Sequence, residues 1–149
     1  MATTDDIARF MQRAFPQGSF DIVATGDRAA TIRRPVTPAD TRPGGTVSGP
    51  TLMALADTAL YVAVHATIGI TPHAVTSNLN IHFLRRPAGD KAVVAVCRLL
   101  RVGRSVAVGE VALYSEGDDE PVAHVTGSYA LPPGERAPRA TAATNPPQA

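Results

Sequence analysis

The chain has 149 residues, enough for one domain with a sizeable hydrophobic core and too few for two such domains. Fourteen Lys and Arg residues balance thirteen Asp and Glu residues, and there is no Trp, so the sequence lacks the basic, aromatic surface that nucleic-acid binding requires. A single cysteine, Cys97, excludes an internal disulfide, and the N-terminal residues do not read as a secretory signal, so we expect a cytoplasmic protein.

The first expected elements are a helix and a hairpin. Apolar residues recur at helical spacing over residues 5–14, which predicts a short amphipathic helix. Residues 20–35 then form two extended segments around a Gly26-Asp27 turn, a pattern typical of a β-hairpin. A loop rich in Pro and Gly, residues 36–45, leads to the next element.

The most hydrophobic part of the sequence runs from Pro50 to Ile70 and contains one carboxylate, Asp57. Gly49 followed by Pro50 is typical of a helix start, so a helix is predicted to begin near Ser48. The segment approaches the length of a membrane span. Its internal ionisable groups and the lack of a basic flank favour a buried helix instead, and we expect no membrane partner.

After this helix the pattern changes to strands. Residues 75–84 alternate between apolar and polar side chains, and three Val-rich runs follow at 92–102, 105–115 and 122–131. Their close spacing predicts that these three pair as an antiparallel meander. The final segment, residues 132–149, is rich in Pro and Ala and is expected to be a disordered tail.

These elements predict an α+β fold. A helix that is apolar on all sides must be covered on nearly every side. We therefore expect a curved antiparallel sheet of five to six strands wrapped around one long apolar helix, forming a single domain over residues 1–131.

Asp57 is the residue that most needs an explanation. Helical spacing places it on the same face as Met53, Leu60 and Tyr61, so its carboxylate must be buried or lie at an interface. Burying an unpaired carboxylate costs several kcal/mol. Asp57 is therefore either a hydrogen-bonded structural residue or a functional one, and perturbed carboxylates concentrate at functional sites.

The start of the same helix offers a second chemical group. Free N–H groups at a helix N-terminus can stabilise a developing oxyanion, and Gly49 leaves room for a carbonyl to approach. Gly49 and Asp57 are eight residues apart, about 12 Å along a helix, which is too far for one carbonyl to meet both. Two antiparallel helices in a dimer would place Gly49 of one chain beside Asp57 of the other.

Three segments together resemble a known family: GTVSGPTLMALADTA (45–59), VTSNLNIHFLRRP (75–87) and RVGRS (101–105). They are similar to the hotdog-fold acyl-CoA thioesterases of the phenylacetate-pathway (PaaI-type) group. The resemblance implies that Asp57 is the general base or nucleophile, that the Gly49 N–H forms the oxyanion hole, and that the Thr76 hydroxyl helps to place water or the carboxylate. It also implies a site shared across a homodimer, dimers that pair into tetramers, and coenzyme A as part of the substrate with no other cofactor.

The chain departs from the family pattern beside the expected oxyanion hole. The family usually has His-Gly-Gly where this chain has Ser48-Gly49-Pro50, and an Asn that often precedes this motif is replaced by Arg42. These changes leave an alternative reading open, namely a non-catalytic acyl-CoA-binding or regulatory hotdog protein. A hydratase of related fold is less consistent with the sequence, because the helix lacks the expected His and acid pair.

The remaining expected contacts concern the substrate. Residues 85–104 hold six basic side chains and one acid, and Arg86 and Arg104 are the candidates for contacting the coenzyme A phosphates. Leu52, Met53 and Leu60 are expected to help line the acyl pocket. No metal site is expected, because the four His residues have no i, i+4 partner. The full set expected to bind the acyl group or coenzyme A is Arg42, Ser48, Pro50, Tyr61, Phe83, Arg86, Arg104 and Ser105.

Overall fold

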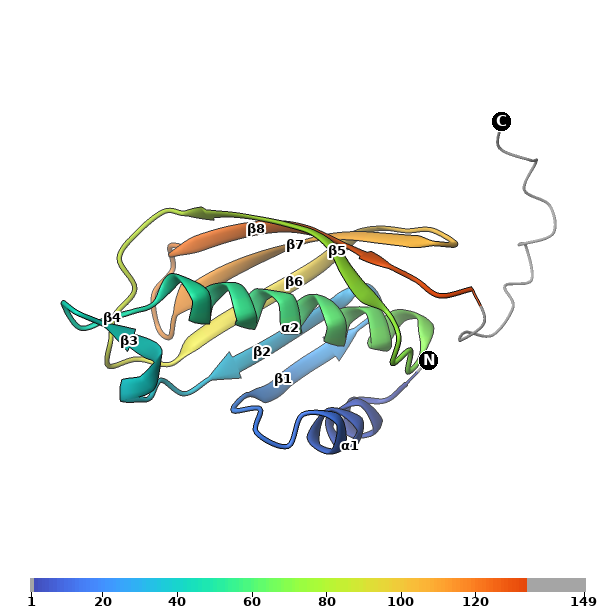
Figure 1. Ribbon diagram of the computed structural model, residues 1–149, viewed down its shortest axis with the longest axis horizontal. Helices are drawn as coiled ribbons and strands as arrows, with labels where there is room; N and C mark the ends of the chain where they lie inside the picture. The colour runs from blue at the N-terminus through green and yellow to red at the C-terminus, as the bar shows by residue number, and fades with distance from the viewer. Residues whose placement is uncertain (1, 134–149) are drawn as a thin grey trace.

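The long central helix, α2 (Gly49–Ile68), lies in the concave face of a six-stranded antiparallel sheet in the computed structural model, which describes residues 2–133 (Figure 1). This arrangement confirms the predicted α+β hotdog fold. The strands follow one another across the sheet in the order β1 (Asp21–Gly26), β2 (Ala29–Arg34), β6 (Val93–Val102), β7 (Val106–Ser115), β8 (Ala123–Ala130) and β5 (Val75–Phe83).

Helix α2 begins where its sequence predicts and ends at Ile68. The Ser48 side chain caps it by accepting the Thr51 N–H at 3.3 Å, and Gly69 ends it with a φ of 96°. The helix is long and apolar enough to cross a membrane, but most of it is buried inside this fold. That burial is typical of a core helix.

The sheet approaches α2 closely because two strands carry glycine where they face it. A Cβ added at Gly109 of β7 or at Gly127 of β8 would lie 2.8 Å from a methyl group of Leu60. Leu60 is only 1% exposed. The expectation that Leu60 lines the acyl pocket is therefore wrong, because this side chain fills the core between α2 and the sheet.

The order of the strands is partly as predicted. Strands β6, β7 and β8 pair consecutively, as the meander prediction requires. Strand β5 pairs with β8 and becomes the edge of the sheet, although it precedes β6 in the chain. The turn of the first hairpin lies at Asp27-Arg28, one residue later than predicted, and Arg28 has a φ of 59° there.

Short elements cover both ends of α2. Helix α1 (Thr4–Ala14) is capped by Thr3 and packs its buried side chains Ile7 and Met11 into the core. The loop predicted at 36–45 contains a 3₁₀ turn, η1 (Pro38–Asp40), and strand β3 (Thr41–Arg42). Strand β3 forms a small hairpin with β4 (Thr46–Val47), which follows the predicted loop and precedes α2. Of the predicted tail, 132–149, only residues 132 and 133 are described.

Candidate active site

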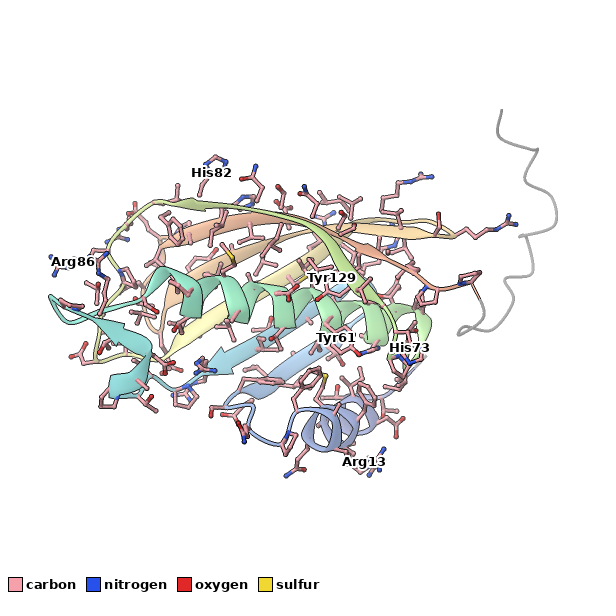
Figure 2. All side chains as sticks on the ribbon, in the orientation of Figure 1. Arg13, Tyr61, His73, His82, Arg86 and Tyr129 are labelled. Carbon is pink, nitrogen blue, oxygen red and sulfur yellow. The ribbon has the colours of Figure 1, made fainter. Side chains whose placement is uncertain are left out.

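A pocket of about 390 Å³ opens beside the middle of α2, and we call it the acid pocket. Asp57 and Tyr61 reach it from α2, Thr76 from β5 and Tyr129 from β8. Figure 2 labels Tyr61 and Tyr129, which lie beside the second half of α2. Aromatic side chains from the segment after α1 also line the pocket. The other lining residues are Met11, Phe15, Gly18, Phe20, Arg34, Thr58, Pro72, Ala74 and Val75.

The Asp57 carboxylate is held in one orientation by two hydroxyl groups. Thr76 Oγ1 donates to Asp57 Oδ1 at 2.6 Å, and Tyr129 Oη donates to the same oxygen at 2.7 Å. Both interactions use Oδ1, and Oδ2 makes no hydrogen bond within residues 2–133. Asp57 is half-buried, so one of its oxygens is fixed by the protein while the other stays available to a ligand or water.

Tyr129 also contacts the helix backbone, because its hydroxyl lies 2.9 Å from the main-chain oxygen of Asp57. Burial raises the pKa of Tyr129 well above its ordinary value, and the neighbouring Asp57 carboxylate acts in the same direction. The phenol therefore stays protonated and serves as a donor. The sequence prediction missed this residue, because only the pairing of β5 with β8, which sets Thr76 opposite Tyr129, brings its hydroxyl to Asp57.

Asp57 lies on the part of α2 that the sheet leaves uncovered. Met53, one turn before Asp57, is 38% exposed, although Tyr61, one turn after it, is buried. The carboxylate therefore lies where the covered half of the helix gives way to the exposed half. The sequence predicts that Asp57 is buried or lies at an interface. In the single chain it is only half-buried, which leaves the interface as the expectation.

A second pocket, of about 590 Å³, lies at the start of α2, and we call it the N-terminal pocket. Gly49 lines it together with Phe83, whose ring packs so closely that a Cβ on Gly49 would lie 3.1 Å from Cζ. Arg42, Arg85 and Arg86 make this pocket basic. Pro43, Thr46, Val47, Leu52 and Pro87 complete its wall.

Only one N–H in the first turn of α2 is free to meet a ligand. Pro50 has no N–H, and the Thr51 N–H is used by the Ser48 cap. The Gly49 N–H donates to no residue in the described part of the chain. Any oxyanion stabilised at this helix end would therefore depend on Gly49.

The structure does not bring Gly49 and Asp57 together within one chain, since they line different pockets. Figure 2 shows the separation: Arg86 lies near the beginning of α2, and Tyr61 and Tyr129 lie beside its second half. The predicted residues thus divide into two groups. Asp57, Tyr61 and Thr76 line the acid pocket, whereas Arg42, Gly49, Phe83 and Arg86 line the N-terminal pocket.

Six predicted residues line neither pocket: Leu60, which fills the core, the exposed Met53, and Ser48, Pro50, Arg104 and Ser105. Ser48 and Pro50 flank Gly49 and shape the helix start, where Ser48 acts as the cap. Arg104 and Ser105 are exposed in the turn between β6 and β7, at the end of the sheet away from Arg86. Within one chain they do not reach Gly49 or Asp57.

Strand β5 is an edge strand whose outer side lacks a partner within residues 2–133. Seven of its nine residues are exposed, including two large apolar ones, Val75 and Phe83. Leu84, directly after the strand, is 53% exposed. A long edge with exposed apolar side chains is typical of a surface that pairs with another chain.

Among residues 2–133, no three His, Cys, Asp or Glu side chains gather closely enough to hold a metal ion. The buried His65 is engaged locally instead, because its Nδ1 accepts the Thr71 N–H at 3.0 Å. Its ring lies against Phe10 and Tyr61.

Comparisons with known proteins agree with this fold. Residues 44–122 match the model of the thioesterase superfamily. A protein from Silicibacter sp. TM1040, assigned as a thioesterase, is 41% identical, with a TM-score of 0.81 over 88% of this chain and 92% of its own. The E. coli PaaI protein of the phenylacetic acid degradation operon is 22% identical, with a TM-score of 0.74 over 89% and 95% of the two chains.

A third solved structure contains a ligand. The smu.793 protein of Streptococcus mutans UA159, bound to acetyl CoA, is 20% identical to this chain, with a TM-score of 0.72 over 80% of this chain and 93% of its own. At this identity the likeness shows the shared fold. No curated protein matches the sequence.

Proposed function

This chain belongs to the thioesterase superfamily and is a thioester hydrolase, and on that premise we propose that it hydrolyses acyl-CoA thioesters with Asp57 as its catalytic carboxylate. The observation that carries the proposal is the geometry of Asp57. Two hydroxyls fix Oδ1, and Oδ2 remains available in a pocket large enough for an acyl group. The acyl group would be a small aromatic or a short or medium aliphatic chain.

The chemistry needs a base or nucleophile and a place for negative charge. Asp57 Oδ2 either takes a proton from water as the water attacks the thioester carbonyl, or attacks that carbonyl itself. The carbonyl oxygen becomes negatively charged in either case, and the Gly49 N–H would donate to it. The C–S bond then breaks and the thiolate of coenzyme A takes up a proton. When water is the nucleophile, this step releases the carboxylic acid. When Asp57 is the nucleophile, it leaves a mixed anhydride on Asp57, and a water molecule then hydrolyses the anhydride, which releases the acid and restores the carboxylate.

Two subunits would complete each site. If β5 pairs antiparallel with the β5 of a second copy, the Val75 end of one strand meets the Phe83 end of the other. The acid pocket includes Val75, and the N-terminal pocket includes Phe83. This pairing therefore brings Asp57 of one subunit toward Gly49 of its partner, as the family resemblance implies, and further pairing of dimers gives a tetramer.

The N-terminal pocket is suited to the phosphates of coenzyme A. Arg42, Arg85 and Arg86 contribute three positive charges to its wall, and the Arg86 guanidinium is anchored by a 2.8 Å hydrogen bond to the Gly44 carbonyl. Arg85 pairs with Glu120 at 3.2 Å, which neutralises part of this charge. A related fold binds acetyl CoA in smu.793, which supports a coenzyme A ester as the substrate class.

The decisive experiment compares hydrolysis of an acyl-CoA panel by the wild type and the Asp57→Asn variant. Asparagine keeps the size and the hydrogen-bond acceptor of Asp57 but removes the base, so kcat should fall about a thousand-fold. The exposed turn residue Asp27 provides the control, since Asp27→Asn should leave kcat unchanged. Similar rates for Asp57→Asn and the wild type would remove Asp57 from the mechanism, and tight binding without turnover by the wild type would favour an acyl-CoA-binding role.

A further inference from the structure

The wall of the acid pocket contains one cationic side chain, Arg34, among the residues that line it. Arg34 ends β2, and its Nη2 donates to Asp40 Oδ1 at 2.7 Å. Asp40 is only 4% exposed, and its second oxygen accepts the Thr37 N–H at 3.0 Å. The guanidinium is thus held at one edge by a buried carboxylate that is itself held in place.

The rest of the guanidinium is not engaged by the protein. Arg34 Nε is buried without a hydrogen-bond partner, and Nη1 has none within residues 2–133. The side chain is 28% exposed, so part of it is accessible. Since a guanidinium carries five N–H donors in a fixed plane, the ion pair with Asp40 leaves donors that a bound molecule can use.

The charges around the pocket favour a neutral oxygen over a carboxylate as the acceptor of a hydrogen bond from Arg34. Although burial opposes ionisation, the hydrogen bonds from Arg34 and from the Thr37 N–H lower the pKa of Asp40 below its ordinary value, so Asp40 is charged at neutral pH. Asp40 therefore neutralises Arg34, and Asp57 adds a further negative charge to the same pocket. A carboxylate on the acyl group would be repelled, whereas a neutral oxygen would gain a hydrogen bond without that cost.

We propose that Arg34 selects acyl groups that carry a neutral oxygen acceptor, such as a ketone or an ether, at a position remote from the thioester. The inference deepens the proposed function and rests on it, because it requires the acid pocket to hold the acyl group. Arg34 acts on specificity and takes no part in breaking the thioester. Asp40 neutralises the positive charge of Arg34, so the acyl group meets hydrogen-bond donors without a net positive charge.

Matched acyl-CoA substrates test this directly. The 5-methylhexanoyl, 5-oxohexanoyl and glutaryl thioesters end in groups of nearly the same shape that are apolar, neutral with an acceptor, and anionic. The 6-methylheptanoyl, 6-oxoheptanoyl and adipoyl thioesters repeat the comparison one carbon further along. At one of these lengths the wild type should prefer the oxo over the methyl substrate about five-fold in kcat/KM, as one additional hydrogen bond predicts, with the anionic substrate the poorest.

Two variants test whether the preference for the oxo substrate depends on the Arg34–Asp40 ion pair. Arg34→Lys keeps a positive charge for Asp40 but removes the additional donors, so the oxo preference should fall to about one while hydrolysis of the methyl substrate persists. Asp40→Asn keeps an acceptor for Arg34 but removes the negative charge, so kcat/KM for the anionic substrate should rise about five-fold relative to the oxo substrate. Thermal denaturation of each variant confirms that it is folded.

The two proposals fail in different ways. Equal kcat/KM for oxo and methyl substrates at both lengths, or an oxo preference that survives in Arg34→Lys, would overturn the role of Arg34 and leave Asp57 untouched. Undiminished hydrolysis by Asp57→Asn would overturn the catalytic proposal. Dissociation constants of the same thioesters measured on Asp57→Asn compare oxo with methyl groups without turnover, so the inference is decided even if hydrolysis is undetectable.

Discussion

The Tyr129 hydroxyl contacts Asp57 twice, at 2.7 Å from the carboxylate Oδ1 and at 2.9 Å from the main-chain oxygen. Strand β8 therefore fixes both the side chain and the backbone of the candidate catalytic residue. The second hydroxyl on Oδ1 comes from Thr76, on the strand paired with it. The orientation of Asp57 is set by the β5–β8 pair as much as by its own helix.

Replacing Tyr129 by Phe should lower kcat about ten-fold with little change in KM. The ring still fills its buried position, but Asp57 Oδ1 keeps only the hydrogen bond from Thr76. The orientation of the whole carboxylate, and so of Oδ2, is then less well fixed. Steady-state kinetics with one acyl-CoA measure the effect. Tyr114→Phe on β7 is the matched control, since Tyr114 lies outside both pockets, and an equal loss in that control would contradict the positioning role of Tyr129.

Mixing two inactive variants should restore activity if each site is shared between subunits. One chain carries Asp57→Asn and the other Gly49→Val, so a mixed dimer retains one site with both groups intact. Random reassociation gives about a quarter of wild-type activity, because half of the dimers are mixed and each has one working site. Activity is measured after joint unfolding and refolding of the two variants. No recovery, despite mixed dimers detected by mass, would place Gly49 and Asp57 in one subunit's site.

Gly49→Ala should reduce kcat about ten-fold, because the new Cβ would lie only 3.1 Å from the Phe83 ring and would occupy space beside the Gly49 N–H that an approaching carbonyl needs. The second variant, Gly49→Ala combined with Phe83→Leu, removes that crowding and should recover part of kcat. Comparison with Phe83→Leu alone isolates the effect of the methyl group. Full activity of Gly49→Ala would exclude close approach at Gly49 as a requirement.

Arg86→Gln should raise KM for an acyl-CoA several-fold and leave KM for the corresponding acyl-pantetheine unchanged, since only coenzyme A carries the nucleotide phosphates. Raising the salt concentration should narrow the difference between variant and wild type. Arg13, an exposed residue of α1 far from Arg86 in Figure 2, supplies the control variant Arg13→Gln. An equal effect on both substrates would argue against phosphate recognition at Arg86.

Stability should fall as the pH is lowered from neutral, through His65. Burial lowers the pKa of His65 from 6.5 to about 4, so the unfolded chain binds a proton there more readily than the folded one. The resulting loss begins below pH 6.5, reaches about 2 kcal/mol at pH 5, and is complete near pH 4. Urea unfolding at pH 7.5 and pH 5 measures it.

The matched variant for this pH effect is His65→Asn, whose side-chain oxygen can accept the Thr71 N–H that His65 Nδ1 accepts now. It should be less stable at pH 7.5, because packing against Phe10 and Tyr61 is lost, yet its stability should change less between the two pH values. An unchanged pH dependence in His65→Asn would assign the effect to another group.

The fold was predictable from the sequence because its signals are local. The apolar run after Gly49 and the alternation after Val75 define the central helix and the first long strand without any knowledge of their neighbours. The pairing of β5 with β8 was not predictable in the same way, since it joins segments separated by two other strands. The order of the strands along the chain does not show which strands become neighbours in the sheet.

The same distinction applies to the site. Asp57 and Gly49 stand out because one is charged within an apolar helix and the other begins that helix. Tyr129 and Arg34 look like ordinary strand residues, and only the register of β8 with β5 and the turn that carries Asp40 bring them to the acid pocket. Arg104 could be chosen from its charge alone, but its distance from Arg86 in one chain shows that charge does not determine location.

The missing side chains at Gly109 and Gly127 have a consequence for the chemistry as well as for packing. Gly127 precedes Tyr129 by two residues on β8, and Leu60, which both glycines admit, follows Asp57 by one turn on α2. A methyl group at Gly127 would force the strand away from the helix, and the 2.7 Å hydrogen bond from Tyr129 to Asp57 would lengthen with it. The absence of a side chain at these two core positions thus fixes the length of the hydrogen bond that orients the candidate catalytic carboxylate.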